Sequence, residues 1–156
     1  MAILTHTFIF PGLKPFSVNA SYVRTFAGVT KSSGASEYCA QIFNIMARQD
    51  FQQKLQELKS AFKETEHAFE VHMIAFYPES EFYTKKGLLS NRTIDISNGE
   101  KAILDCLWLP KFNEEPFPYG APNLSCDDRF ITKMISEKRK SHERRIEVTI
   151  SVIEKP

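Results

Sequence analysis

Residues 91–108 read NRTIDISNGEKAILDCLW, and this stretch decides the expected fold because it joins an extended segment to an amphipathic helix. Within the helix expected over 98–108, Asn98, Lys101 and Asp105 lie on one face, since helical residues three or four apart share a side. The opposite face is apolar and is expected to pack against a sheet. This apolar face consists of Ala102, Ile103, Cys106 and Leu107.

Acidic residues accompany this helix on both sides. Asp95 precedes it, Asp105 lies on its polar face, and the pair Asp127-Asp128 follows further along the chain. Carboxylate oxygens are the ligands that Mg²⁺ prefers, and a protein-bound Mg²⁺ usually keeps open positions for substrate phosphates. The residues therefore suggest a magnesium site.

The same residues also have an ordinary structural interpretation. Ser97 and Glu100 match the S-x-x-E capping box that begins many helices. Asp95 suits a helix N-terminus, and Lys101 and Asp105 form a common i,i+4 ion pair. Spacing alone leaves both interpretations open.

The pattern D-I-S-N-x-x-K-x-x-x-D over 95–105, followed by D-D at 127–128, resembles the signature of the RusA-type Holliday junction resolvases. The segment KPFSVNASYVR near the N-terminus is similar to the family's P-x-S-x-N opening. Thr30-Lys31-Ser32, ahead of an expected helix, fits the family's start of strand, basic loop and helix. The similarity extends over nearly the whole chain.

This resemblance implies a crossover junction endodeoxyribonuclease of the kind found in phages and prophages. Such an enzyme uses Mg²⁺ or Mn²⁺ to hydrolyse phosphodiester bonds in four-way DNA junctions during DNA recombination and repair. The family's active form is a homodimer whose two sites cut opposing strands. A four-way DNA junction and a second copy of the chain are therefore the expected partners.

The resemblance also implies roles for individual residues. The expected metal ligands are Asp95, Asp127, Asp128 and Asp105. Catalysis is expected to depend on Asp95 and Asp128, and on Lys101 as the positive group that stabilises the transition state.

Two departures from the family pattern keep other functions open. Ser97 stands where many members have a second Asp, and the segment 109–125 between the helix and the acidic pair is longer than in the family. The first departure motivates an alternative function, a junction-binding protein with weak or no cleavage. A third hypothesis is a phage structural or adaptor protein in which the acidic motif only caps a helix.

Charge gives a local signal for nucleic acid but no global one. The formal net charge is only +1, yet residues 129–145 contain seven Lys or Arg against two Glu, a local excess of +5. A basic patch attracts phosphate backbones, although a charged turn is often only solvated. The residues expected to contact DNA are Asn19, Arg24, Lys31, Lys138, Arg139 and Lys140.

Length and cysteine content limit the class of protein. With 156 residues, the chain is expected to form a single domain. Three cysteines without C-x-x-C spacing favour neither a structural zinc site nor a disulfide framework. No leader sequence and no apolar run near eighteen residues is apparent, so the expected location is the cytoplasm, that of a bacterial host if the phage resemblance holds.

Hydrophobic periodicity predicts the order β-α-β-α-β-β. Strands are expected at 4–10, 69–76, 130–136 and 144–153, with the last two forming an antiparallel pair joined through 137–143. Helical spacing over 37–62 indicates one long helix or two, and 79–89 is expected to be an irregular connector. These elements predict an α+β fold, a small mixed sheet with helices on one face, as the resemblance also implies.

Overall fold

A computed structural model gives the fold of the chain. The structure describes residues 2–16, 22–25, 28–31, 33–93, 101–108 and 123–156. The fold is α+β, and the expected fold class is confirmed at that level.

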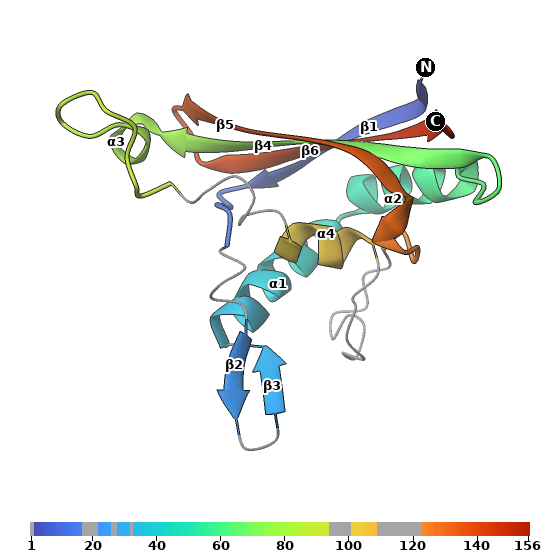
Figure 1. Cartoon of the computed structure of the whole chain (residues 1–156), viewed down its shortest axis with the longest axis horizontal. Helices are drawn as coiled ribbons and strands as arrows, with labels where there is room; N and C mark the ends of the chain where they lie inside the picture. The colour runs from blue at the N-terminus through green and yellow to red at the C-terminus, as the bar shows by residue number, and fades with distance from the viewer. Residues whose placement is uncertain (1, 17–21, 26–27, 32, 94–100, 109–122) are drawn as a thin grey trace.

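The centre of the fold is a mixed sheet of four strands in the order β1-β6-β4-β5 (Figure 1). The strands are β1 (Ala2–Pro11), β4 (His67–Pro78), β5 (Ile131–Ser141) and β6 (Arg145–Glu154). β6 pairs antiparallel with both β1 and β4, whereas β5 pairs parallel with β4. All four strands were predicted. Those expected at 4–10, 69–76 and 130–136 are shorter than β1, β4 and β5, and the one expected at 144–153 is as long as β6.

The predicted pairing of the last two strands was wrong. β4 lies between β5 and β6, because Phe76 pairs with Arg145 of β6 while Pro78 pairs with Ser141 of β5. The short segment 142–144 therefore crosses the end of β4 instead of closing a hairpin. β4 can occupy this position because it alternates apolar residues along its whole length, as a central strand does.

Three helices lie on one face of the sheet (Figure 1). These are α1 (Ser33–Met46), α2 (Gln49–Ala61) and α4 (Lys101–Leu107). The helical region expected over 37–62 is thus two helices. The smaller elements are the hairpin of β2 (Tyr22–Thr25) and β3 (Gly28–Lys31), the helix α3 (Glu79–Phe82) and the 3-10 turn η3 (Asp128–Phe130).

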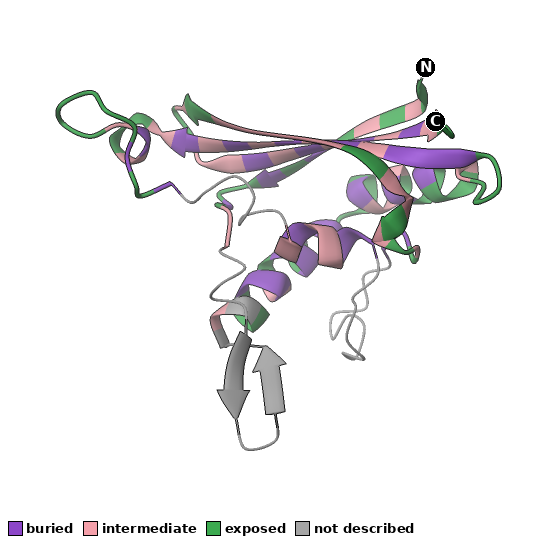
Figure 2. Ribbon diagram, viewed as in Figure 1, coloured by how far each residue is buried: buried purple, intermediate pink, exposed green. Residues whose placement is uncertain are grey.

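The core lies between the sheet and these helices (Figure 2). Alternate residues of the two central strands point into it, among them Val71 of β4 and Ile150 of β6, which are completely buried. Phe69 stacks on Phe62, with ring centroids 4.4 Å apart, and meets Trp108 edge to face. Burying a large apolar side chain contributes about 1.5–3 kcal/mol each, so this layer fixes α4 relative to the sheet.

Within the described residues, no helix covers the opposite face of the sheet (Figure 1). Ile9 of β1 is half exposed there, and Ile74 and Phe76 of β4 are partly exposed. Polar residues surround them, including His72, whose Nε2 lies 2.9 Å from Oε1 of Glu137. The sheet therefore presents a face of mixed polarity.

None of the described helices is long and apolar enough to cross a membrane.

Candidate metal and DNA site

The helix α4 is held by its apolar side. Ile103 and Leu107 are completely buried, and Cys106 and the adjoining Trp108 are nearly or completely so. The predicted apolar face is confirmed, with Ala102 only partly buried at its margin. This burial leaves the other side of the helix as a polar edge that can face a ligand.

The polar edge of α4 carries the expected ion pair. Nζ of Lys101 lies 3.3 Å from Oδ2 of Asp105, and both side chains are partly exposed. The pair brings a cation and a carboxylate together at the surface beside the motif. It is compatible with both interpretations of the sequence, since i,i+4 pairs also form on ordinary helices.

The first part of the motif lies outside the described residues. Asp95, Ser97 and Asn98 fall within 94–100, and most of the long segment 109–125 falls within 109–122. Their expected roles therefore stay predictions.

After that long segment the chain returns to the C-terminal end of α4. Asn123 Nδ2 donates to the carbonyl of Cys106 at 3.2 Å, and the backbone N–H of Leu124 donates to the carbonyl of Leu107 at 2.9 Å. The last carbonyls of a helix lack partners within the helix, and these bonds satisfy two of them. Asn123 is buried. The sequence did not predict its role, because no local pattern indicates a hydrogen bond to a residue so far away in the chain.

The acidic pair follows directly from this return. Asp127 comes three residues after Leu124, and its carboxylate accepts a bond of 2.8 Å from the backbone N–H of Arg129, which caps η3. Asp127 is exposed and Asp128 partly buried. The chain thus contacts the C-terminal end of α4 three residues before Asp127.

The donor chemistry of this region suits a hard cation, because the candidate ligands are all carboxylates. Among the described residues, no group of three His, Cys, Asp or Glu side chains could hold a metal ion. Asp105, Asp127 and Asp128 are all described, so the structure does not bring these three together as a metal-binding group. Those four residues, Asp95, Asp105, Asp127 and Asp128, remain the predicted ligands.

Cys126 shows how the acidic pair affects its surroundings. Burial, followed by the charge of the neighbouring Asp127, raises the pKa of the Cys126 thiol to about 11. A carboxylate disfavours a second negative charge beside it, just as desolvation does. The site therefore keeps this cysteine in its protonated, unreactive form.

The segment that leads into Asp95 is anchored to β5. Thr93 is buried, its hydroxyl donates to the carbonyl of Ser90 at 3.1 Å, and its Oγ1 accepts a bond of 3.0 Å from Nζ of Lys138. Lys138 was expected to contact DNA; its ammonium donates one bond to Thr93 and has two further donors, so that contact stays a prediction.

The other basic residues are distributed over different surfaces. Arg139 Nε donates to Glu137 at 2.7 Å, and this bond, with the one from His72, lowers the pKa of the Glu137 carboxyl. Lys140 lies over the ring of Tyr83, with Nζ 5.6 Å from its centroid. Arg139 and Lys140 are neighbours on a strand and so project to opposite faces.

The remaining expected DNA contacts lie far from this strand. Arg24 and Lys31 belong to the two strands of the β2–β3 hairpin. Asn19 lies outside the described residues. The hairpin stands away from the sheet beyond α1 (Figure 1), so these residues and β5 form separate candidate contacts.

In comparisons with known proteins, no protein-family model matches this sequence, and no curated protein matches it either.

Proposed function

We propose that this protein is a Mg²⁺- or Mn²⁺-dependent endodeoxyribonuclease that resolves four-way DNA junctions. The observation that supports this proposal best is the arrangement around α4. One face of the helix is buried, its polar edge carries Lys101 and Asp105 3.3 Å apart, and the Asn123 and Leu124 bonds return the chain to the C-terminal end of the helix shortly before the acidic pair. The sequence resemblance to RusA-type resolvases supplies the reaction.

Each residue has a role in this proposal. Asp95, Asp127 and Asp128 would hold the metal ion, with Asp105 as a further ligand or as the carboxylate that positions Lys101. The bound ion would supply Lewis-acid polarisation of a phosphodiester oxygen. Lys101 would stabilise the negative charge that develops on the phosphate in the transition state, as fixed positive groups do at phosphoryl centres.

The proposal includes a homodimer, since a four-way junction has two equivalent strands to cut and a two-fold dimer offers two equivalent sites. The open face of the sheet is the surface that favours it. On that face Ile74 lies between Glu147 and Glu137, and Phe76 lies between Arg145 and Arg139, so apolar and charged side chains alternate across the strands. An interface between two copies would combine apolar contacts with ion pairs there. A second copy of the chain is the proposed occupant.

A junction-binding protein without efficient cleavage is the second candidate function. Ser97 favours it, because a serine supplies only a neutral oxygen where an aspartate would supply a charged ligand. The adaptor hypothesis has no comparable support in the described residues.

Incubation of the purified protein with a synthetic four-way junction, with and without Mg²⁺, tests the proposal. Metal-dependent paired nicks would support the nuclease. Tight junction binding without nicks would favour the second candidate. If the protein neither binds nor cuts the junction, the motif would act only as a helix cap.

A further inference from the structure

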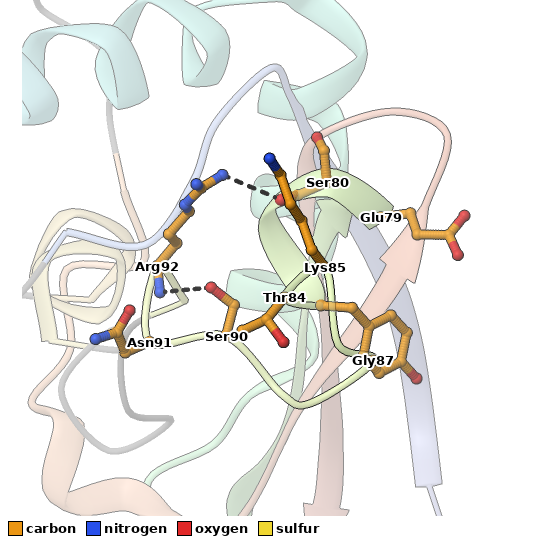
Figure 3. Close-up of a pocket in the computed structure, with 9 residues that line it drawn as sticks. Glu79, Ser80, Thr84, Lys85, Gly87, Ser90, Asn91 and Arg92 are labelled. Carbon is orange, nitrogen blue, oxygen red and sulfur yellow. Dashed lines mark hydrogen bonds between the residues drawn. The ribbon is translucent and has the colours of Figure 1, made fainter.

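A pocket opens beside α3, in a region where the sequence suggested only an irregular connector. It has a volume of about 790 Å³ and lies between α3 and the segment that leads to Thr93 (Figure 3). The side chains that line it include five polar or charged ones, Ser80, Thr84, Lys85, Ser90 and Arg92.

The walls of the pocket are held by hydrogen bonds. The backbone N–H of Gly87 donates to the carbonyl of Thr84 at 2.9 Å, and Gly87 has a φ of +78°, a conformation that side chains rarely adopt. The backbone N–H of Ser90 donates to the carbonyl of Phe82 at 2.9 Å, which ties the far end of the loop to α3. The loop that forms the pocket wall is therefore held in one conformation by its own hydrogen bonds.

Two cations share this pocket. Figure 3 shows the Lys85 ammonium and the Arg92 guanidinium pointing to the same side, beside Ser80. Arg92 Nη1 donates to the carbonyl of Ser80 at 3.2 Å, which fixes the guanidinium there. Two positive groups directed to one place repel each other unless an anion lies between or beside them.

The acidic side chains nearby do not supply that anion. Glu79 lines the pocket, but its carboxylate points away from Lys85 and Arg92 in Figure 3 and lies 3.8 Å from Nζ of Lys140. Glu81 pairs with Arg144. Among the described residues, no carboxylate forms an ion pair with Lys85 or Arg92, so the pocket has an uncompensated positive charge.

We propose that this pocket binds one backbone phosphate of a nucleic acid, with the Arg92 guanidinium and the Lys85 ammonium as charged donors and the Ser80 hydroxyl as a neutral one. Arginine is suited to this role because its planar fork can donate two parallel bonds to phosphate oxygens. The inference rests on the proposed function for its ligand, DNA, but the residues that carry it lie outside the proposed metal site.

The position of Arg92 also predicts which phosphate is bound. Arg92 precedes Asp95 by three residues, a length of chain that spans at most about 11 Å. A DNA strand rises about 3.4 Å per nucleotide. Because the two side chains add their own reach to this span, the bound phosphate lies within several nucleotides of the one that is cut, and the pocket sets the register of the strand at the metal site.

The test uses the Asp95→Asn full-length protein, so that junction binding is measured without cleavage. Adding Lys85→Gln and Arg92→Gln should weaken binding at least about tenfold and reduce the slope of log affinity against log salt by about 0.9, the value for one phosphate contact on duplex DNA. The matched control is Arg48→Gln with Lys59→Gln, at the start of and within α2, neither of which lines the pocket.

A charge-preserving exchange, Lys85→Arg with Arg92→Lys, should keep most of the salt slope, and melting curves check that each variant folds. An unchanged affinity and slope in the neutralised protein would overturn the inference. Saturation of the pocket by inorganic phosphate, seen by NMR, with unchanged DNA affinity would also overturn it, because the pocket would then hold a free anion.

These outcomes are separable from those of the proposed function. A wild-type protein that never cuts DNA, yet loses affinity and salt slope in the neutralised variant, would refute the nuclease and support the pocket. Normal cleavage by the wild type, with no effect of neutralising Lys85 and Arg92 on binding, would support the nuclease and refute the pocket.

Discussion

Nζ of Lys138 donates a hydrogen bond of 3.0 Å to Oγ1 of Thr93, so a residue of the edge strand β5 holds the chain two residues before Asp95. Lys138 is part of the basic stretch in the sequence, and this contact gives it a positioning role within the protein. One hydrogen bond thus links the basic stretch on β5 to the segment that leads into the acidic motif.

Replacing Thr93 with Val should slow cleavage more than it weakens DNA binding. The change removes both the acceptor for Lys138 and the bond to the Ser90 carbonyl, and leaves a partly buried ammonium without its partner. We expect a loss of about 1–3 kcal/mol in stability and a cleavage rate that falls about tenfold to a hundredfold, since small misplacements of catalytic groups are costly. Single-turnover rates and junction affinity measure the two effects.

Thr7→Val is the matched control for that variant. Thr7 also makes a side-chain hydrogen bond, to Thr149 at 2.9 Å, but on the exposed side of the sheet. A Thr93→Val protein as active as Thr7→Val would show that the contact with Lys138 does not position the site.

Replacing Ser97 with Asp should lower the Mg²⁺ concentration needed for half-maximal cleavage. The added carboxylate restores the more common family pattern and gives a hard cation another charged oxygen. Folding should hold, because Asp caps helices about as well as Ser. Titration of cleavage against Mg²⁺ measures the effect, and a requirement that is unchanged or higher would place Ser97 outside the metal site.

Cys126 should react slowly with iodoacetamide. Burial and Asp127 raise its pKa from 9.0 to about 11, so at pH 8 its thiolate fraction is about a hundredfold smaller than for an ordinary cysteine. The rate should rise with pH up to about 11 and should increase in Asp127→Asn. Mass spectrometry identifies the labelled residue, and the guanidinium-unfolded protein gives the reference rate. An ordinary rate in the folded protein would contradict the account of this thiol.

Replacing Ile74 with Glu should convert the proposed dimer into a monomer, because it replaces an apolar contact on the open sheet face with a third carboxylate beside Glu137 and Glu147. Leu88→Glu, the same kind of change at an exposed loop residue, is the control and should leave the dimer intact. Analytical ultracentrifugation measures both. A wild-type protein that is monomeric at micromolar concentration would refute the dimer, and an Ile74→Glu protein that remains dimeric would place the interface elsewhere.

Much of the fold follows from local sequence patterns. Alternation of apolar residues identified all four sheet strands, and the apolar face of the helix after Ser97 correctly predicted the burial of Ile103 and Leu107. The parallel pairing of β4 and β5 was not predictable from the short connection at 142–144, because that length suggests a hairpin. The strand order depends instead on which strand is apolar enough to be central in the sheet, and β4 occupies that position between β5 and β6.

The candidate site was only partly accessible to sequence reasoning. The acidic motif is local and was recognised as a pattern, whereas the partners of Asn123 and Thr93 lie 17 and 45 residues away. The pocket beside α3 was missed because its two cations, Lys85 and Arg92, are separated by a loop whose closure depends on hydrogen bonds across it. Long-range contacts of this kind leave no periodic signal.

Cleavage of a synthetic four-way junction by the wild-type and Asp95→Asn proteins tests the central claim most directly. Asn keeps the size of the side chain but removes the charge that a hard cation needs. The account predicts Mg²⁺-dependent paired nicks by the wild type, a loss of at least about a hundredfold in Asp95→Asn with junction binding retained, and normal activity in Asp50→Asn, the same change in the first turn of α2. Equal activity of the Asp95→Asn and wild-type proteins, or the absence of Mg²⁺-dependent cleavage by the wild type, would contradict it.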